Sequence, residues 1–150
     1  MDVLLIQAEG VDLYTTLVKS ETSRGILRFY HPTRLDYGVL IRTASLGSSL
    51  SLISEIRWYI RRYVEEVLFL MPEGTYCSLD LVQQVYKRNI RLRAPWQHRS
   101  LYAIRDGRLV QSLPIAPGKE RSDYAELLEG MDDVLEVWCT DPEAEDRATL

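Results

Sequence analysis

The hydrophobic residues near the N-terminus come in short runs separated by turn-forming residues. Four runs are rich in aliphatic, β-branched or aromatic side chains, at residues 3–8, 13–19, 25–30 and 37–44. Turn chemistry separates them, for example at Glu9-Gly10 and His31-Pro32. Short apolar runs with such boundaries are typical of β-strands. We therefore predict an N-terminal antiparallel sheet formed by these four runs.

After Gly47 the spacing of the apolar residues changes to three and four. Nine residues follow this spacing: Leu52, Ile53, Ile56, Ile60, Tyr63, Val64, Val67, Leu68 and Met71. The spacing is typical of an amphipathic helix whose apolar stripe packs against a sheet. We predict one long helix over residues 50–71, which ends at Pro72 and Gly74.

Two further elements are indicated by local signals in the second half of the chain. Ser78 is a suitable N-cap for a shorter helix that fades near Asn89. The Asp106-Gly107 pair lies between apolar runs at residues 101–104 and 109–110. An Asp-Gly pair in this position is typical of a type I′ turn, so we predict a β-hairpin.

The chain is predicted to end with a helix-strand unit and an acidic tail. Acidic N-terminal residues and a closing glycine favour a short helix over residues 123–130, and the apolar run at 134–139 favours a strand. Residues 141–150 are polar and acidic, and we expect no regular structure there. The fold class predicted is α+β, with a single domain over residues 1–140.

The composition is that of an ordinary globular domain. The chain has 150 residues, of which 46% are hydrophobic and 27% charged. Cys77 and Cys139 are far apart in sequence and form no CxxC motif, which favours a reducing compartment. The N-terminus lacks a basic leader pattern, and the helix predicted over residues 50–71 contains six charged residues. We expect a soluble protein of the cytoplasm or nucleus that is not secreted.

The formal net charge of −4 conceals two segments of opposite sign. Between residues 87 and 108, seven lysines and arginines are accompanied by one acid, Asp106. Between residues 120 and 146, eleven acids are accompanied by one base, Arg121. Such segregation creates local fields that the net charge does not reveal.

The sequence lacks the motifs of most enzyme classes. It contains no GxxxxGK[ST], GxGxxG, GxSxG or HExxH motif and no paired CxxC. The two histidines, His31 and His98, cannot form a multi-histidine metal site, so a metal would need carboxylate or thiol ligands. We favour a non-catalytic protein with no cofactor and no metal. The alternative is an enzyme with His31 or His98 as general base.

The basic segment is the main functional candidate. If residues 89–94 are extended, Arg91 and Arg93 share one exposed face. Lys87 and Arg88 lie where the helix dipole already favours cations, so they have a structural explanation as well. Trp96 adds a ring on which a base could stack.

Two more arginines, Arg105 and Arg108, flank the predicted turn and are brought together by it, which is unfavourable unless they are solvated or meet an anion. Basic residues interleaved with an aromatic residue are typical of a surface that binds phosphate backbones and bases. We predict a nucleic-acid or nucleoprotein interface of eight residues: Lys87, Arg88, Arg91, Arg93, Trp96, Arg99, Arg105 and Arg108.

Two alternatives explain the same charges differently. In the first, the protein serves assembly or acts as an adaptor: its basic surface meets the acidic segment 123–145 of another copy, an acidic protein, or an anionic membrane surface. In the second, Arg91 and Arg93 pair with the acidic segment of their own chain and Trp96 fills the core.

Overall fold

The computed structural model describes residues 1–93 and 95–141, and within them eight strands form one mixed sheet in the order β2-β3-β1-β4-β5-β8-β6-β7. The strands are β1 Asp2–Gln7, β2 Thr33–Leu35, β3 Gly38–Arg42, β4 Val64–Leu70, β5 Tyr76–Ser78, β6 Arg99–Arg105, β7 Arg108–Pro114 and β8 Asp133–Trp138. The helices are α1 Leu13–Lys19, α2 Glu21–Leu27, α3 Leu46–Glu55, α4 Arg57–Tyr63, α5 Leu79–Tyr86 and the 3-10 helix η1 Arg121–Tyr124. The protein therefore has the predicted α+β fold.

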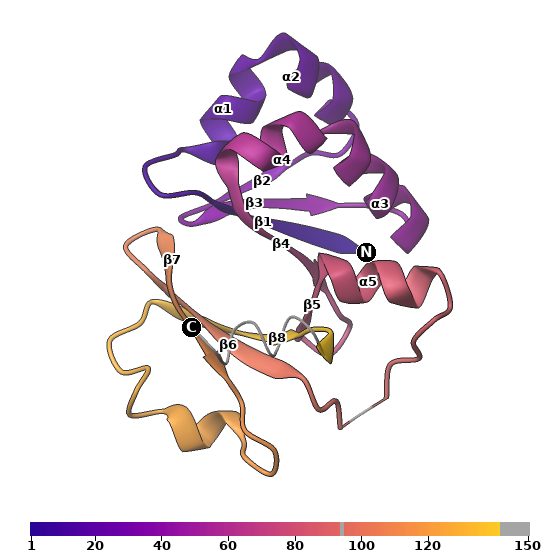
Figure 1. Cartoon of the computed structure of the whole chain (residues 1–150). Helices are drawn as coiled ribbons and strands as arrows, with labels where there is room; N and C mark the ends of the chain where they lie inside the picture. The colour runs from indigo at the N-terminus through magenta and orange to yellow at the C-terminus, as the bar shows by residue number, and fades with distance from the viewer. Residues whose placement is uncertain (94, 142–150) are drawn as a thin grey trace.

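Strand β1 lies at the centre of the molecule and is buried on both faces. Val3 and Leu5 contribute to a helix-side core, which lies beneath the helices. Leu4 and Ile6 contribute to a second core, which is shared with β6 and β8. Figure 1 shows helices α1 to α4 on one side of β1 and β4, and strands β6 and β8 on the other. A strand covered on both faces needs an unbroken apolar run, which is what the Val3 to Ile6 sequence provides.

The predicted N-terminal antiparallel sheet is half correct. β1 pairs antiparallel with β3 and β4, so two of the four predicted strands are confirmed. The predictions for residues 13–19 and 25–30 are wrong, because α1 and α2 occupy most of that region. The side chain of Asp12 accepts a hydrogen bond from the Thr15 amide and caps α1. Leu13 and Leu17, four residues apart, then share the buried face of α1, which β-propensity alone does not reveal.

The long helix predicted over residues 50–71 is also wrong. Its first part is broken into α3 and α4 at Ile56, and residues from Val64 onward form β4. β4 pairs with β1 along its length, for example Val67 with Leu5. The Val64 to Leu70 stretch contains β-branched residues and three consecutive buried side chains, which a strand covered on both faces accommodates. Over a segment as short as Val64–Leu70, the apolar spacing of an amphipathic helix cannot be distinguished from the apolar run of a buried strand.

In the second half of the chain, α5 and the β-hairpin are confirmed. Positive φ angles of 54° at Asp106 and 76° at Gly107 give the hairpin its predicted type I′ geometry. The last strand is also confirmed as β8, which pairs antiparallel with β6 and parallel with β5. The helix predicted over residues 123–130 is wrong: the 3-10 helix η1 is followed by turns, because only Leu128 in that range is buried and no apolar stripe supports an α-helix.

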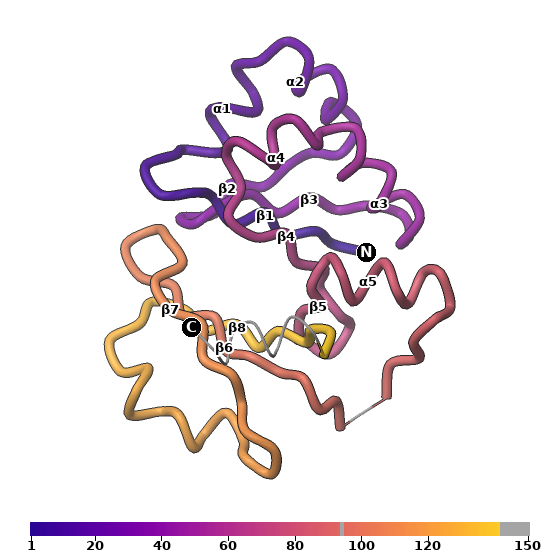
Figure 2. Tube along the Cα trace, viewed as in Figure 1, coloured from indigo at the N-terminus to yellow at the C-terminus, as the bar shows by residue number. Residues whose placement is uncertain are grey.

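The tip of the β6–β7 hairpin packs against the end of β1, as Figure 2 shows. The Gln7 side chain joins three segments there. Its Nε2 donates to the carbonyls of Asp36, at 3.0 Å, and Gly107, at 2.9 Å, and its Oε1 accepts from the Leu13 amide at 3.2 Å. An ion pair between Arg108 and Glu9 adds to this contact. The two halves of the sheet are therefore connected at a second place, away from their shared strand β5.

No helix in the described ranges combines the length and apolar character that crossing a membrane would require. Of the acidic tail predicted for residues 141–150, all but Asp141 lies outside the described residues.

The thiol of Cys77 is expected to be unreactive in the folded protein. It is fully buried in the helix-side core, and burial raises its pKa from 9.0 to about 12, with a smaller contribution from Cys139. We expect Cys77 to resist iodoacetamide at about pH 8 and to react after unfolding in urea, as measured by peptide mass spectrometry. The folded state favours the neutral thiol of Cys77, because the pKa is higher there than in the unfolded chain. This contribution to the free energy of unfolding is fully present below pH 9 and is lost as the pH rises toward 12. Equal labelling of native and unfolded protein would contradict this expectation.

Candidate nucleic-acid interface

The basic segment begins where α5 ends. Lys87 is the C-cap, and its amide donates to the Gln83 carbonyl. Arg88 has a positive φ of 62°, and the Asn89 amide donates to the Gln84 carbonyl at 3.0 Å. This is the geometry with which many helices end, although glycine is the usual residue at the left-handed position. The reversal at Arg88 directs the chain away from the helix and toward β6.

Residues 90–93 are not a strand, but they show the predicted alternation. Ile90 and Leu92 are half-buried against the helix-side core, and Arg91 and Arg93 are exposed. Both arginines line a shallow groove of about 210 Å³ together with residues 95–98. The ion pairs formed between described residues do not include either arginine. The predicted pairing with the acidic segment of the same chain is therefore not found in the described part, and residues 142–150 lie outside it.

Trp96 is held in place from several sides. Its Nε1 donates to the Cys139 carbonyl at 2.9 Å, and its ring lies nearly parallel to that of Trp138, with centroids 6.3 Å apart. The His98 ring approaches it edge-on at 6.2 Å. The indole packs partly against the helix-side core, as the core-filling alternative predicted, and it also lines grooves on the surface.

A larger groove of about 720 Å³ lies between residues 95–99 and residues 114–118. Its walls are mostly apolar and include Pro95, Trp96 and Ile115, and His98 and Arg99 supply nitrogen donors. This volume and this mixture of apolar walls with a few polar groups are typical of ligand sites in proteins. Residues 114–118 contain two prolines and a glycine, a composition typical of a loop, and no local signal connects that loop with Trp96.

Arg99 is held in the wall of this groove by a hydrogen bond. Its Nη2 donates to the Lys119 carbonyl at 2.9 Å, which fixes the guanidinium. Its Nε is buried, and no described atom accepts a hydrogen bond from it. A buried N–H group without an acceptor costs free energy, and because this nitrogen has no accessible surface, a ligand in the groove would contact other parts of Arg99. The neighbouring residue His98 also lines the groove, and its Nε2 lies 3.6 Å from Oδ1 of Asp141.

The structure distributes the eight predicted interface residues over three places. Arg91, Arg93, Trp96 and Arg99 line or adjoin the two grooves described above. Arg105 ends the seven-residue strand β6, about 20 Å from Arg99 at roughly 3.3 Å per residue. Arg108 begins β7 and stands opposite Arg105. Arg108 is there paired with Glu9. Lys87 lines a separate groove between α3, α4 and α5. Arg88 is exposed at the reversal after α5.

The two histidines differ in their surroundings. His31 is exposed in the loop before β2, with a φ of 47°, whereas His98 lies in the large groove beside the carboxylate of Asp141. The histidine alternative is therefore restricted to His98. Within residues 1–93 and 95–141, no cluster of three or more His, Cys, Asp or Glu side chains is arranged to hold a metal ion.

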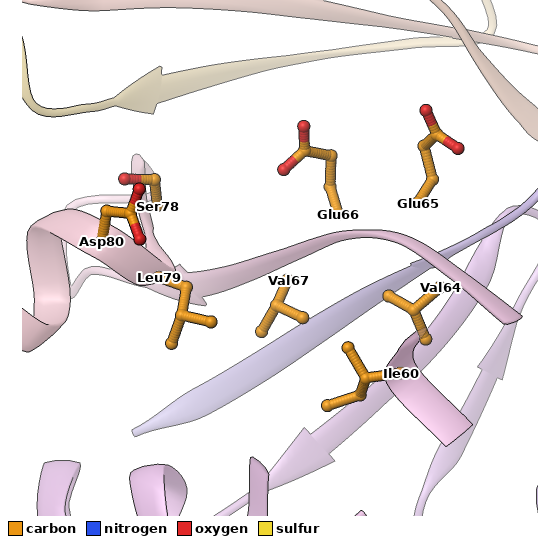
Figure 3. A pocket seen from close by; sticks show the side chains of 8 residues that line it. All are labelled: Ile60, Val64, Glu65, Glu66, Val67, Ser78, Leu79 and Asp80. Atoms are coloured by element: carbon orange, nitrogen blue, oxygen red, sulfur yellow. The ribbon is translucent and has the colours of Figure 1, made fainter. Parts of the chain in front are cut away.

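An acidic hollow of about 220 Å³ lies between the start of β4 and α5. Glu66 and Val64 stand opposite Ile6 and Gln7 of β1, so Glu65 is an extra residue in β4. Such a bulge allows consecutive side chains to point the same way. Figure 3 shows the carboxylates of Glu65 and Glu66 on one side of β4 and Val64 and Val67 on the other. Asp80 of α5 completes the acidic lining.

Comparison with known proteins identifies a family for this chain. The model of a family of unknown function, DUF5804, matches residues 1–104. The chain belongs to this family. The matched region contains β1 to β5, all five α-helices, both arginines of the 90–93 segment, Trp96 and nearly all of β6. It ends before the hairpin turn, β7 and β8. No curated protein and no solved structure matches the chain.

Proposed function

We propose that the protein binds single-stranded nucleic acid along the surface formed by residues 91–93, residues 95–99 and the facing loop 114–118. The observation that carries the proposal is the position of two exposed arginines, Arg91 and Arg93, beside an apolar groove that contains Trp96 and Arg99. In proteins that bind single strands, cations contact the phosphates while bases enter apolar or aromatic sites. Both kinds of group occur together here.

The shape of the site favours a single strand over a duplex. In a duplex the faces of the bases are stacked and cannot enter a groove, whereas an unstacked base presents both faces and its hydrogen-bonding edge. A groove of about 720 Å³ with Pro95 and Ile115 in its walls can enclose one base. Arg99 in the wall of the groove would then place a positive charge beside the base or the adjoining phosphate.

The proposal is tested by the salt dependence of oligonucleotide binding. We expect the wild-type protein to bind a fluorescein-labelled single strand with an affinity that falls steeply with salt. Each phosphate contact with a single strand contributes about 0.7 to the slope of log affinity against log salt, so Arg91→Ala combined with Arg93→Ala should make the slope shallower by about 1.4. Fluorescence anisotropy over a salt series measures both quantities.

A matched control removes the same charge elsewhere. Lys19→Ala with Arg24→Ala changes two exposed cations on α1 and α2, and Figure 1 shows these helices far from the start of β6. We expect this control to leave the slope within experimental error of the wild type. An affinity that does not respond to salt, or an equal loss in both double variants, would refute the proposal.

Self-association is a second candidate function, favoured by the exposure of the acidic segment. Asp123, Glu126 and Glu129 are all exposed between β7 and β8, so they are accessible to the basic surface of another copy. Light scattering of nucleic-acid-free protein distinguishes the two functions. A molar mass that falls from oligomer to monomer as salt is raised would support assembly, and a constant monomer mass would leave nucleic-acid binding as the proposal.

A further inference from the structure

A second groove, of about 520 Å³, lies between α3, α4 and α5. Its floor is aliphatic and consists of Leu50, Ile53, Ile60 and Leu79. The OH group of Tyr86 would lie 3.6 Å from a Cβ atom at Gly47, so the end of α5 is in contact with the start of α3. The break between α3 and α4 at Ile56 leaves the two helices at an angle, and α5 lies beside α3 in Figure 1. The groove is therefore formed by residues of three helices and the C-cap of α5.

The rim of this groove is basic. Arg57 and Arg61 are four residues apart, so they lie on one face of α4, and Lys87 faces them from the end of α5. All three are exposed, and among the described residues that line the groove there is no carboxylate. The ion pairs between described residues leave all three cations out. Tyr86 has 58% of its surface exposed, which is high for an aromatic residue beside an aliphatic floor.

These features fit a particular class of partner. An aliphatic floor with a cationic rim matches an amphipathic protein helix that has leucine-like side chains on one face and acidic side chains beside them. We propose that this groove binds an acidic amphipathic helix of another protein, with its apolar side chains over Ile53 and Ile60 and its carboxylates paired with Arg57, Arg61 and Lys87. The inference is independent of nucleic-acid binding at the surface that contains Arg91, Arg93 and Trp96.

The neighbouring acidic hollow shares Ile60 and Leu79 with this groove. Figure 3 shows the carboxylates of Glu65 and Glu66 on the opposite side of β4 from these two aliphatic side chains. Both carboxylates therefore point away from the shared apolar floor, and the acidic side chains of a helix bound over Arg57 and Arg61 would not face them.

The test uses a synthetic peptide and the chain of 150 residues. The probe is an N-acetylated peptide of about 14 residues with leucines at i, i+3, i+4 and i+7 and glutamates on the flanking positions. A second peptide carries lysines in place of the glutamates. We expect the acidic peptide to bind in isothermal titration calorimetry, and the double variant Arg57→Glu, Arg61→Glu to weaken it by at least about tenfold, because two attractive pairs become repulsive.

Three controls keep the outcome clear. Lys19→Glu with Arg24→Glu reverses two exposed charges on α1 and α2 and should leave peptide binding unchanged. Glu65→Gln removes a carboxylate from the acidic hollow and should not weaken the acidic peptide. Thermal unfolding of each variant tests whether the substitutions at these exposed positions preserve the fold, and we expect melting temperatures close to that of the wild type.

Three results would overturn this inference: no binding of the acidic peptide by the wild-type protein, equal binding of the lysine peptide, or displacement of the acidic peptide by a single-stranded oligonucleotide. The two proposals also separate in one experiment. Arg91→Ala with Arg93→Ala should lower the oligonucleotide affinity and leave the peptide affinity unchanged. Arg57→Glu with Arg61→Glu should lower the peptide affinity and leave the oligonucleotide affinity unchanged.

Discussion

Gly38→Ala is expected to destabilise the protein by at least about 3 kcal/mol. Gly38 begins β3 and pairs with Ile6 of the central strand. A Cβ atom at this position would lie 1.9 Å from the Leu5 carbonyl oxygen and 2.9 Å from its carbon. These are backbone atoms of a strand with partners on both sides, so they cannot rotate away as a side chain could. The methyl group can fit only if β3 separates from β1.

The matched control is the same substitution at Gly25. Gly25 lies inside α2, and a Cβ atom there would meet nothing within 4 Å. Alanine is favoured over glycine in a helix interior, so Gly25→Ala should stabilise the protein by about 0.5–1 kcal/mol. Urea unfolding followed by circular dichroism measures both effects. Equal midpoints for Gly38→Ala and the wild type would show that β3 does not approach β1 as described.

Leu4→Ala and Leu5→Ala are each expected to cost about 2–5 kcal/mol, the usual range for truncation of a fully buried leucine. The two side chains are adjacent in sequence and point to opposite faces of β1, and neither has any exposed surface. Leu5 lies in the core beneath the helices, and Leu4 lies in the core shared with β6 and β8. Similar losses at both positions are what a strand covered on two faces requires.

An exposed leucine provides the reference for this pair. Leu127 has 63% of its surface exposed, and Leu127→Ala should change the free energy of unfolding by less than about 0.5 kcal/mol. The comparison is made by urea unfolding of the three variants. If Leu5→Ala is costly and Leu4→Ala resembles Leu127→Ala, the layer formed by β6 and β8 does not cover β1 in solution.

Much of the local structure follows from the sequence by itself. The type I′ turn at Asp106-Gly107 follows because Asp and Gly tolerate positive φ at both central positions. The start of α5 follows because the Ser78 hydroxyl accepts a hydrogen bond from the Leu81 amide. The exposed arginines at 91 and 93 follow from alternation with Ile90 and Leu92. In each case the signal involves only a few neighbouring residues.

The tertiary structure decided the elements whose local signals were ambiguous. Residues 13–19 form a helix and residues 64–70 form a strand, although both stretches combine β-branched residues with helical apolar spacing. Over about seven residues the two periodicities cannot be separated, so long-range partners determine the result. For 64–70 that partner is β1, which supplies hydrogen bonds along the whole strand. For 13–19 it is the face of the sheet that receives Leu13 and Leu17.

The same division applies to the candidate site. The excess of cations between residues 87 and 108, together with Trp96, could be read directly from the sequence. The groove could not, because Arg99 meets the 114–118 loop only after β6 and β7 have paired, and His98 meets Asp141 only after β8 has joined β6. The separation of Arg105 from Arg91 and Arg93 was equally hidden, since it depends on the full extension of β6. Residue types and local spacing determined the chemistry that the chain carries, and strand pairing over long sequence distances decided which of those groups share a surface.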